Sequence, residues 1–285
     1  MNTPFQTRSI STTAKATNTS DGAGVRLMRS LGTSQVPLVD PFLMLDEFRS
    51  DDPNDYIAGF PAHPHRGFET VTYMLAGSMQ HKDSVGNTGN LRPGSVQWMT
   101  AARGIIHSEM PKQEDGLMWG FQLWVNLPAA DKMGDPRYQD IDPEAIPEHT
   151  LPGGGTVRVV AGRFGDQEGP VGGVATEPMM LDVGLPAGGS VDVPIPTAHN
   201  GFAYVFEGAA QLGNGEAPVA RGHIAVLGRE GDGLHIAAGD EGTRVLVVTG
   251  KPIDEPVARY GPFVMNTRSE LEQAFADYRS GRLTQ

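Results

Sequence analysis

The chain has 285 residues, which is too long for one small hydrophobic core and suits two domains of roughly 130 to 140 residues each. Hydrophobic residues make up 39% of the sequence and charged residues 20%, a composition that excludes wholesale disorder and an integral membrane class. Acidic residues outnumber basic ones by 34 to 22, and the net charge of −12 argues against direct binding to nucleic acid.

The N-terminal region is polar. Residues 1–22 contain no apolar core of signal-peptide length, and no later apolar run is long enough to span a bilayer. We therefore expect a cytoplasmic protein with no membrane partner. The sequence also has no cysteine, which excludes disulfides and thiolate ligands, so a bound metal would need nitrogen and oxygen ligands.

Residues 36–127 are expected to form short strands joined by turns. The 37 glycines and 22 prolines of the chain interrupt it at short intervals, which is typical of all-β proteins. Val71 and Tyr73 alternate with polar neighbours, and a Pro93-Gly94 turn precedes another alternating segment. Residues 117–127 form an aromatic-rich strand candidate.

A change of composition marks the connection between two domains. Residues 128–155 are rich in acidic residues, proline and glycine. In the strand series that follows, YVFEG at 204–208 echoes YMLAG at 73–77, which indicates an internal repeat of one barrel. We expect an N-terminal domain at 1–133 and a C-terminal domain at 134–285.

The C-terminal residues predict one amphipathic helix at about 267–280. Thr267 and Glu270 have the spacing of a capping box, and Gly281 stands where the helix should stop. The residues of its apolar stripe are expected to pack on a barrel; they are Leu271, Ala274, Phe275 and Tyr278.

Two pairs of residues at a spacing of two suggest a metal site. His63 and His65 would leave the same face of an extended strand, and His107 and Glu109 repeat that spacing. Facing each other inside a barrel, the pairs would supply three imidazole nitrogens and one carboxylate and leave coordination positions open. This donor set suits Fe, Mn, Co, Ni, Cu or Zn.

Residues 63–111, HPHRGFETVTYMLAGSMQHKDSVGNTGNLRPGSVQWMTAARGIIHSEMP, resemble the signature region of the pirin family, a branch of the bicupin proteins. Three further segments are similar to pirin segments and occur in the expected order: DPFLMLDEF at 40–48, GFQLWVNLP at 120–128 and YGPFVMNTRSEL at 260–271. The resemblance thus spans nearly the whole chain.

Membership of this family implies an all-β fold with two cupin barrels, of the double-stranded β-helix or jelly-roll type, packed face to face. It also implies a metal in the N-terminal barrel alone. The positions that match the family's ligands are His63, His65, His107 and Glu109. Iron, as Fe(II), is the metal associated with pirins, so we expect one divalent transition metal per chain.

Glu69 is the alternative to Glu109 as the fourth ligand. In cupins generally, a Glu shortly after the His-x-His pair binds the metal, and the parity of Glu69 with His65 permits it to face inward. Pirins are understood to use the later Glu instead. Glu69 would then lie behind a ligand and orient it. Glu109 is the first candidate for a catalytic base, with Glu69 in reserve.

The second barrel has lost most of the corresponding ligands. Aligned on the first barrel, it has Pro194 and Pro196 in place of the first histidine pair and Ala237 in place of the later Glu; His235 alone is retained. Four other histidines are expected to lie on loops, on the surface or beside local partners: His81, His149, His199 and His223.

Pirins resemble flavonol 2,3-dioxygenases, which open the central ring of quercetin with O2 and release carbon monoxide. The expected partners are therefore O2 and a flat aromatic substrate such as a flavonol, and four side chains that could line its pocket or fill a core are Trp98, Met99, Trp119 and Trp124. The family also implies an alternative, an iron-dependent redox-sensing co-regulator that binds a transcription factor or metabolic enzyme. A third hypothesis is a cupin isomerase or hydrolase that uses the metal as a Lewis acid.

Overall fold

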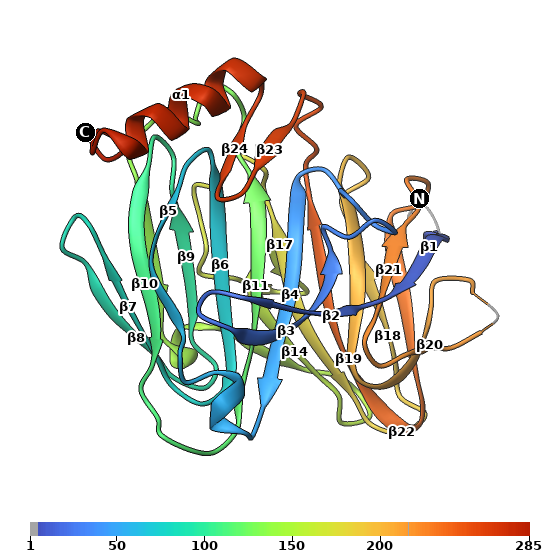
Figure 1. The fold of residues 1–285 in the computed structure, drawn as a ribbon. Coiled ribbons are helices and arrows are strands. Elements are labelled where there is room, and N and C mark those ends of the chain that lie inside the picture. The colour runs from blue at the N-terminus through green and yellow to red at the C-terminus, as the bar shows by residue number, and fades with distance from the viewer. Residues whose placement is uncertain (1–4, 216) are drawn as a thin grey trace. The chain divides into compact units, whose positions relative to one another are not determined.

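The structure is a computed structural model that describes residues 5–215 and 217–285. Figure 1 shows a chain built almost wholly of β-strands, with an α-helix, α1 (Arg268–Arg279), near its C-terminus. The named strands pair in antiparallel fashion throughout the two large sheets. The predicted all-β fold with one C-terminal helix is confirmed for the described part of the chain.

The described residues form two compact units, which we call the N-terminal barrel and the C-terminal barrel. The N-terminal barrel consists of residues 18–29, 43–143 and 253–285. The C-terminal barrel consists of residues 5–17, 30–42 and 144–252.

These units differ from the predicted division between residues 133 and 134. The first strand, β1 (Ile10–Lys15), pairs with β21 (His223–Leu227) of the C-terminal barrel, whereas residues 253–285 belong to the N-terminal barrel. The physical reason is that periodicity identifies a strand or a helix but not the sheet that it joins, because the partners lie far apart in the sequence.

The N-terminal barrel contains two sheets of four or more strands and a terminal two-stranded hairpin. The strands of the larger sheet are β2 (Thr17–Asp21), β3 (Val25–Leu31), β4 (Phe42–Ser50), β6 (Phe68–Ala76), β9 (Val96–Thr100), β11 (Met118–Asn126) and β12 (Arg137–Ile141). Those of the smaller sheet are β5 (Phe60–His65), β7 (Met79–Asp83), β8 (Thr88–Leu91) and β10 (Ile105–Pro111). The orders are β12-β9-β6-β11-β4-β3-β2 and β5-β10-β7-β8.

The strands of this barrel follow the predicted alternation. Val71 and Tyr73 of β6 are fully buried, and β9 pairs beside them after the turn at Pro93 and Gly94. Gly94 has a φ of +85°, a backbone conformation that glycine adopts without steric cost. β11 pairs along the other side of β6, which confirms the strand predicted at 117–127.

The C-terminal barrel has one large sheet and a small hairpin. Its remaining strands are β13 (Glu148–Thr150), β14 (Thr156–Ala161), β15 (Arg163–Phe164), β16 (Gln167–Glu168), β17 (Met179–Leu185), β18 (Ser190–Pro194), β19 (Asn200–Leu212), β20 (Val219–Ala220) and β22 (Gly233–Gly250). β19 pairs with β21 and β22 much as β6 pairs with β9 and β11, in agreement with the predicted repeat. Aliphatic side chains such as Val159, Leu181 and Val247 fill its core.

The chain ends on the N-terminal barrel with a hairpin and the helix. The hairpin strands β23 (Ala258–Tyr260) and β24 (Phe263–Met265) lie beside α1 (Figure 1). Arg66, between β5 and β6, binds the helix through an ion pair of 2.7 Å to Asp277. Its guanidinium also donates to the Leu283 carbonyl at 3.2 Å. This polar contact fixes the C-terminal segment next to the first histidine pair.

The sequence signals for the helix are borne out. The Thr267 hydroxyl accepts from the Glu270 amide, and the Glu270 carboxylate accepts from the Thr267 amide, so the capping box is complete. Leu271 and Ala274 are buried in a cluster with Phe263 of β24, whereas Tyr278 of the predicted stripe is 41% exposed. Among the residues that the structure describes, no helix has the length and apolar character needed to cross a membrane.

Candidate metal centre

Two adjacent strands carry the predicted ligands. β5 presents His63 and His65, which share one face because alternate residues of a strand point the same way. β10 runs antiparallel to β5 and places His107 directly opposite His63. The register shifts between His107 and Glu109, where an irregularity interrupts the pairing of the two strands.

The three imidazoles form a compact cluster. One ring nitrogen from each of His63, His65 and His107 lies within 4.8 Å of the other two. Nδ1 of His65 and Nε2 of His107 are buried and have no hydrogen-bond partner among the described residues. Because buried polar atoms are normally satisfied, converging nitrogens without partners fit a bound metal ion. The cluster could therefore hold one.

Burial keeps two of these imidazoles neutral. It lowers the pKa of His65 well below the usual value of 6.5, and the neighbouring His63 lowers it further. Burial likewise lowers the pKa of His107, with additional contributions from the other histidines of the cluster. A neutral imidazole offers the lone pair that a metal requires, so the environment suits metal binding.

Glu109 lies near the cluster but outside the group of converging nitrogens. Its side chain is buried, and its Oε1 lies 2.9 Å from the Thr72 hydroxyl of β6, which is a possible donor to it. The same hydroxyl lies 2.8 Å from the Gln122 amide of β11. Since a hydroxyl has one proton, Thr72 can donate to only one of these two acceptors at a time.

The structure places Glu69 elsewhere. Its Oε1 accepts from the Thr100 hydroxyl at 2.7 Å, on the face of β6 opposite to Thr72, and Glu69 does not line the pocket at His63 and His65. The expectation that Glu69 shares the inward face of His65 assumed one continuous strand. Instead β5 ends at His65 and β6 begins at Phe68 in the other sheet, with Gly67 at a φ of +87° between them. The rule that residues an even number apart share one face holds only within a single strand, so it cannot relate Glu69 to His65 across that turn.

One residue of the site was missed by sequence reasoning. His81 was expected on a loop, but it lies in β7, where it pairs with Glu109 and is 1% exposed. Its Nδ1 lies 3.3 Å from Nδ1 of His107. Along β7, Met79 and His81 are buried and Lys82 is exposed, an alternation that is typical of a strand and was the one local signal available.

A pocket of about 600 Å³ opens onto this cluster, a volume in the range of small-molecule sites. His63, His65 and Glu109 line it, together with Trp124. Of the aromatic and sulfur-containing candidates, Trp124 is thus at the pocket, whereas three do not line it: Trp98, Met99 and Trp119. Each of these three is less than 9% exposed and belongs to the core.

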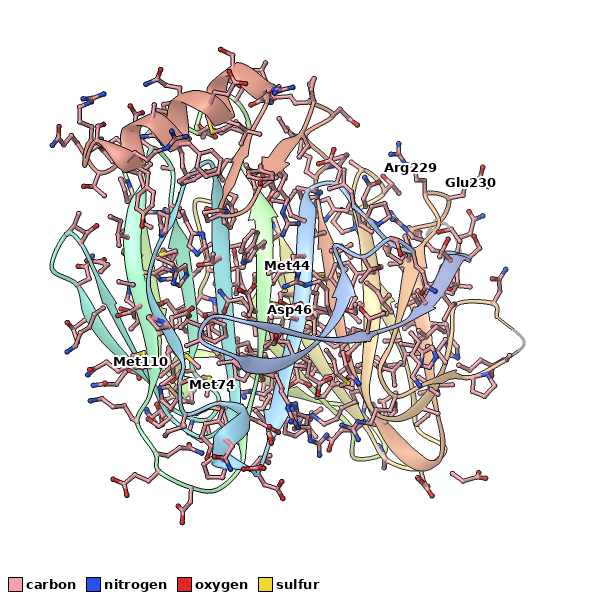
Figure 2. The ribbon with its side chains drawn as sticks, viewed as in Figure 1. Met44, Asp46, Met74, Met110, Arg229 and Glu230 are labelled. Carbon is pink, nitrogen blue, oxygen red and sulfur yellow. The ribbon has the colours of Figure 1, made fainter. Side chains whose placement is uncertain are left out.

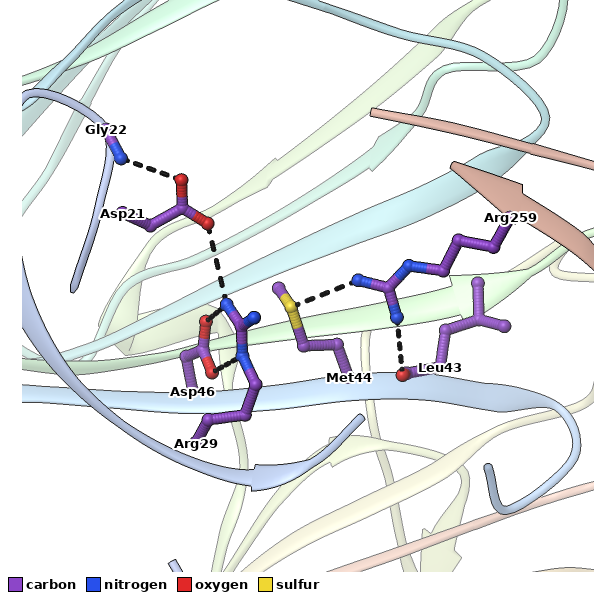
Figure 3. Close-up of polar contacts among 7 residues, drawn as sticks. All are labelled: Asp21, Gly22, Arg29, Leu43, Met44, Asp46 and Arg259. Atoms are coloured by element: carbon purple, nitrogen blue, oxygen red, sulfur yellow. Dashed lines mark hydrogen bonds and ion pairs between the residues drawn. The ribbon is translucent and has the colours of Figure 1, made fainter. Parts of the chain in front are cut away.

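Charged side chains form another part of the pocket wall. Met44 and Asp46 lie along β4 (Figure 2). The guanidinium of Arg29 binds Asp46 with two hydrogen bonds of 2.6 and 2.8 Å, and the hydrogen bond to this carboxylate raises the pKa of Arg29. Figure 3 shows this pair on one side of Met44 and Arg259 on the other. Arg259 also stacks on Trp124, with 4.7 Å from its Cζ to the ring centroid.

The described residues of the C-terminal barrel do not form such a cluster. Within the described residues, the one group of three or more potential metal ligands is that of His63, His65 and His107. The histidines of the other barrel have local partners instead: His235 binds Asp192 at 2.6 Å, and His199 lies 3.1 Å from the Thr249 hydroxyl.

Two β-barrels of cupin type with one histidine cluster define the class, a bicupin protein. The Pirin family model matches residues 24–125, and the model of the Pirin C-terminal cupin domain matches residues 180–284. The chain belongs to the pirin family. It is 42% identical to human pirin over 267 residues, which cover 92% of this chain and 89% of that protein.

Two further proteins connect the family to a named activity. A Pseudomonas aeruginosa protein whose name assigns it provisionally as a quercetin 2,3-dioxygenase is 54% identical over 270 residues, covering 93% of this chain and 94% of the relative. The solved structure of a quercetin 2,3-dioxygenase from Acinetobacter baumannii superposes with a TM-score of 0.90 at 34% identity, covering 97% of this chain and 98% of the other.

Proposed function

We propose that the N-terminal barrel binds one Fe(II) ion through His63, His65, His107 and Glu109, and that the chain is a dioxygenase that cleaves quercetin-type flavonols with O2. The observation that carries this proposal is the convergence of three histidine nitrogens at a pocket large enough for a small aromatic molecule. The relatives named as quercetin 2,3-dioxygenases support the choice of reaction.

The donor set limits the metal without selecting one. Imidazole nitrogens and a carboxylate suit Fe, Mn, Co, Ni, Cu and Zn, and cysteine is absent from the sequence. The resemblance to pirins favours Fe(II) within this group. When bound, the ion supplies Lewis acidity towards a substrate hydroxyl and redox chemistry towards O2.

Glu109 is our choice for the fourth ligand because it is two residues from His107 on β10, is buried and lines the pocket. Glu109 is also our candidate for the base that accepts the proton of a substrate hydroxyl, provided that it loosens from the metal. The amide of Gln122 lines the same pocket and can hydrogen-bond a bound molecule, while Trp124 offers it an apolar surface.

The direct test combines metal analysis with turnover. Protein purified without added metal should contain about one iron per chain, and with quercetin it should consume O2 and release carbon monoxide. A metal-loaded protein that consumes no O2 with a panel of flavonols would favour the co-regulator role. Product formed in the absence of O2 would favour the Lewis-acid isomerase or hydrolase.

A pair of matched variants tests the choice of carboxylate. Glu109→Gln replaces an anionic oxygen by a neutral amide, so it should weaken metal binding and stop flavonol-dependent O2 uptake. Glu69→Gln makes the same change in a residue that does not line the pocket and should leave the metal content unchanged. Loss of metal from the Glu69 variant alone would reverse the assignment.

A further inference from the structure

Behind the histidine cluster lies a buried contact between two imidazoles. Nδ1 of His81 faces Nδ1 of His107 at 3.3 Å, and both side chains are 1% exposed. The strand register sets this contact, because β7 pairs with β10 so that His81 lies opposite Glu109 and Asp83 lies opposite His107. The ring of Tyr138 packs against His81 with centroids 4.9 Å apart.

The chemistry of imidazole restricts how this pair can share a proton. A neutral imidazole has one N–H and one lone pair, so one ring must donate and the other must accept. If the proton lies on Nδ1 of His81, His107 must accept at its own Nδ1 and carry its proton on Nε2. If the proton lies on Nδ1 of His107, the Nε2 lone pair of His107 is free to bind a metal ion.

The surroundings of His81 favour the second arrangement. Nε2 of His81 lies 4.0 Å from Oδ2 of Asp83, too far for a hydrogen bond but close enough for the carboxylate to attract a proton there. Asp83 is itself held in place by Asn87. Its Oδ2 accepts from the side-chain amide of Asn87 at 2.7 Å, and its Oδ1 accepts from the backbone N–H of Asn87 at 2.9 Å. The carboxylate therefore has a fixed position behind the ring.

We infer that His81 is a positioning residue that holds His107 in the tautomer whose Nε2 lone pair points at the metal site. The order of groups is Asp83, then His81 protonated on Nε2, then His107 protonated on Nδ1. Partners behind a metal-binding histidine are usually carboxylates, carbonyls or water, and here a second imidazole occupies that place. This inference rests on the proposed metal site and adds to it a residue that does not line the pocket.

The test measures Zn(II) affinity of the metal-free full chain, with Zn(II) as a diamagnetic probe. His81→Leu removes the acceptor and should weaken Zn(II) binding by about 10- to 100-fold. In His81→Asn, the amide oxygen can accept from Nδ1 of His107 and should restore most of the affinity. His199→Leu is the matched control, because it also removes a buried histidine with an Nδ1 partner but in the C-terminal barrel, and it should leave the affinity unchanged.

Nitrogen-15 NMR of the metal-free wild type provides a readout that a purely structural role would not move. We expect His107 protonated on Nδ1 and His81 protonated on Nε2 before any metal is bound. Unchanged affinity in His81→Leu, or a proton on Nδ1 of His81 in the metal-free protein, would overturn the inference while leaving the metal site intact. A wild-type protein that binds no Zn(II) would instead refute the proposed metal site itself.

Discussion

Glu69 is a buried carboxylate on the face of β6 opposite to Thr72. It is 1% exposed, and burial raises its pKa above the usual value, against the opposing effect of the hydrogen bond from Thr100. The raised pKa means that the folded state binds this proton more tightly than the unfolded chain does. The stability that the protonated Glu69 side chain gives the folded state is therefore fully present at pH values below the unfolded pKa of about 4.3. This stability is lost as the pH rises through the pKa of Glu69 in the folded state.

This sign leads to a prediction for Glu69→Gln, whose amide stays neutral at every pH and can still accept from Thr100. The variant should be more stable than the wild type at about pH 7.5, and the difference should vanish as the pH falls towards the unfolded pKa. Urea unfolding of both proteins at several pH values gives the comparison. If the variant is instead less stable than the wild type at neutral pH, and this deficit disappears in acid, the Glu69 carboxylate is stabilising and the prediction is wrong.

The residues also show what local sequence can and cannot reveal. His63 and His65 could be identified as a pair because a spacing of two depends only on one extended strand. His81 could not be identified in this way, because its contact with His107 depends on the register between β7 and β10. The two histidines are 26 positions apart in the sequence. The parity of Glu69 with His65 permitted an inward position for Glu69, but parity is not a guide here because β5 ends at His65 and β6 begins at Phe68 in the other sheet, with Gly67 at a positive φ between them.

At the scale of elements, the C-terminal hairpin and helix complete the N-terminal barrel. Arg66 and Gly67 form the turn between the two sheets, and both contact the C-terminal segment. Lys132 reinforces this junction from a buried position, where its ammonium donates to the carbonyls of Gly67 and Val264 at 2.6 and 3.1 Å. The turn that separates the histidine strand from β6 is thus also the docking point of the chain's last segment.

Gly67→Ala tests this junction. A Cβ at position 67 would collide with the Val264 carbonyl oxygen, and the backbone has a φ of +87°. The variant should lose about 2 to 4 kcal/mol of unfolding free energy from backbone strain and overpacking together. Urea denaturation measures the loss.

Gly86→Ala provides the control for that experiment. Gly86 has a φ of +98°, but apart from its chain neighbours no atom of the described residues lies within 4 Å of the position that a Cβ would take, so the substitution adds backbone strain without a collision. Its cost should be about 1 to 2 kcal/mol. Equal losses in the two variants would mean that the contact with Val264 contributes nothing, and that the hairpin docks independently of the turn.

The elements themselves were largely predictable, whereas their partners were not. The helix could be located because Thr267, Glu270 and Gly281 provide start and stop signals within a few residues. That it packs in the N-terminal barrel could not be foreseen, since the contact between Arg66 and Asp277 joins residues 211 positions apart. The same limit applies to β1, which pairs with β21 near the other end of the chain.

At the scale of the whole molecule, the two barrels repeat one strand pattern but carry different residues at the positions that align with the proposed metal ligands. The sequence already showed proline and alanine where ligands would stand in the second barrel, and the structure gives His199 and His235 local hydrogen-bond partners. The duplicated fold therefore offers one candidate metal centre among the described residues. The bicupin architecture could be predicted because the resemblance extended over nearly the full length.

The most direct test of this account is the metal content per chain, measured by elemental analysis of protein purified without added metal. We expect about one transition-metal ion per chain in the wild type, none in His107→Ala and the full amount in His235→Ala. Two ions per chain, or a His107→Ala variant that keeps its metal, would contradict a single centre built on the histidines of the N-terminal barrel.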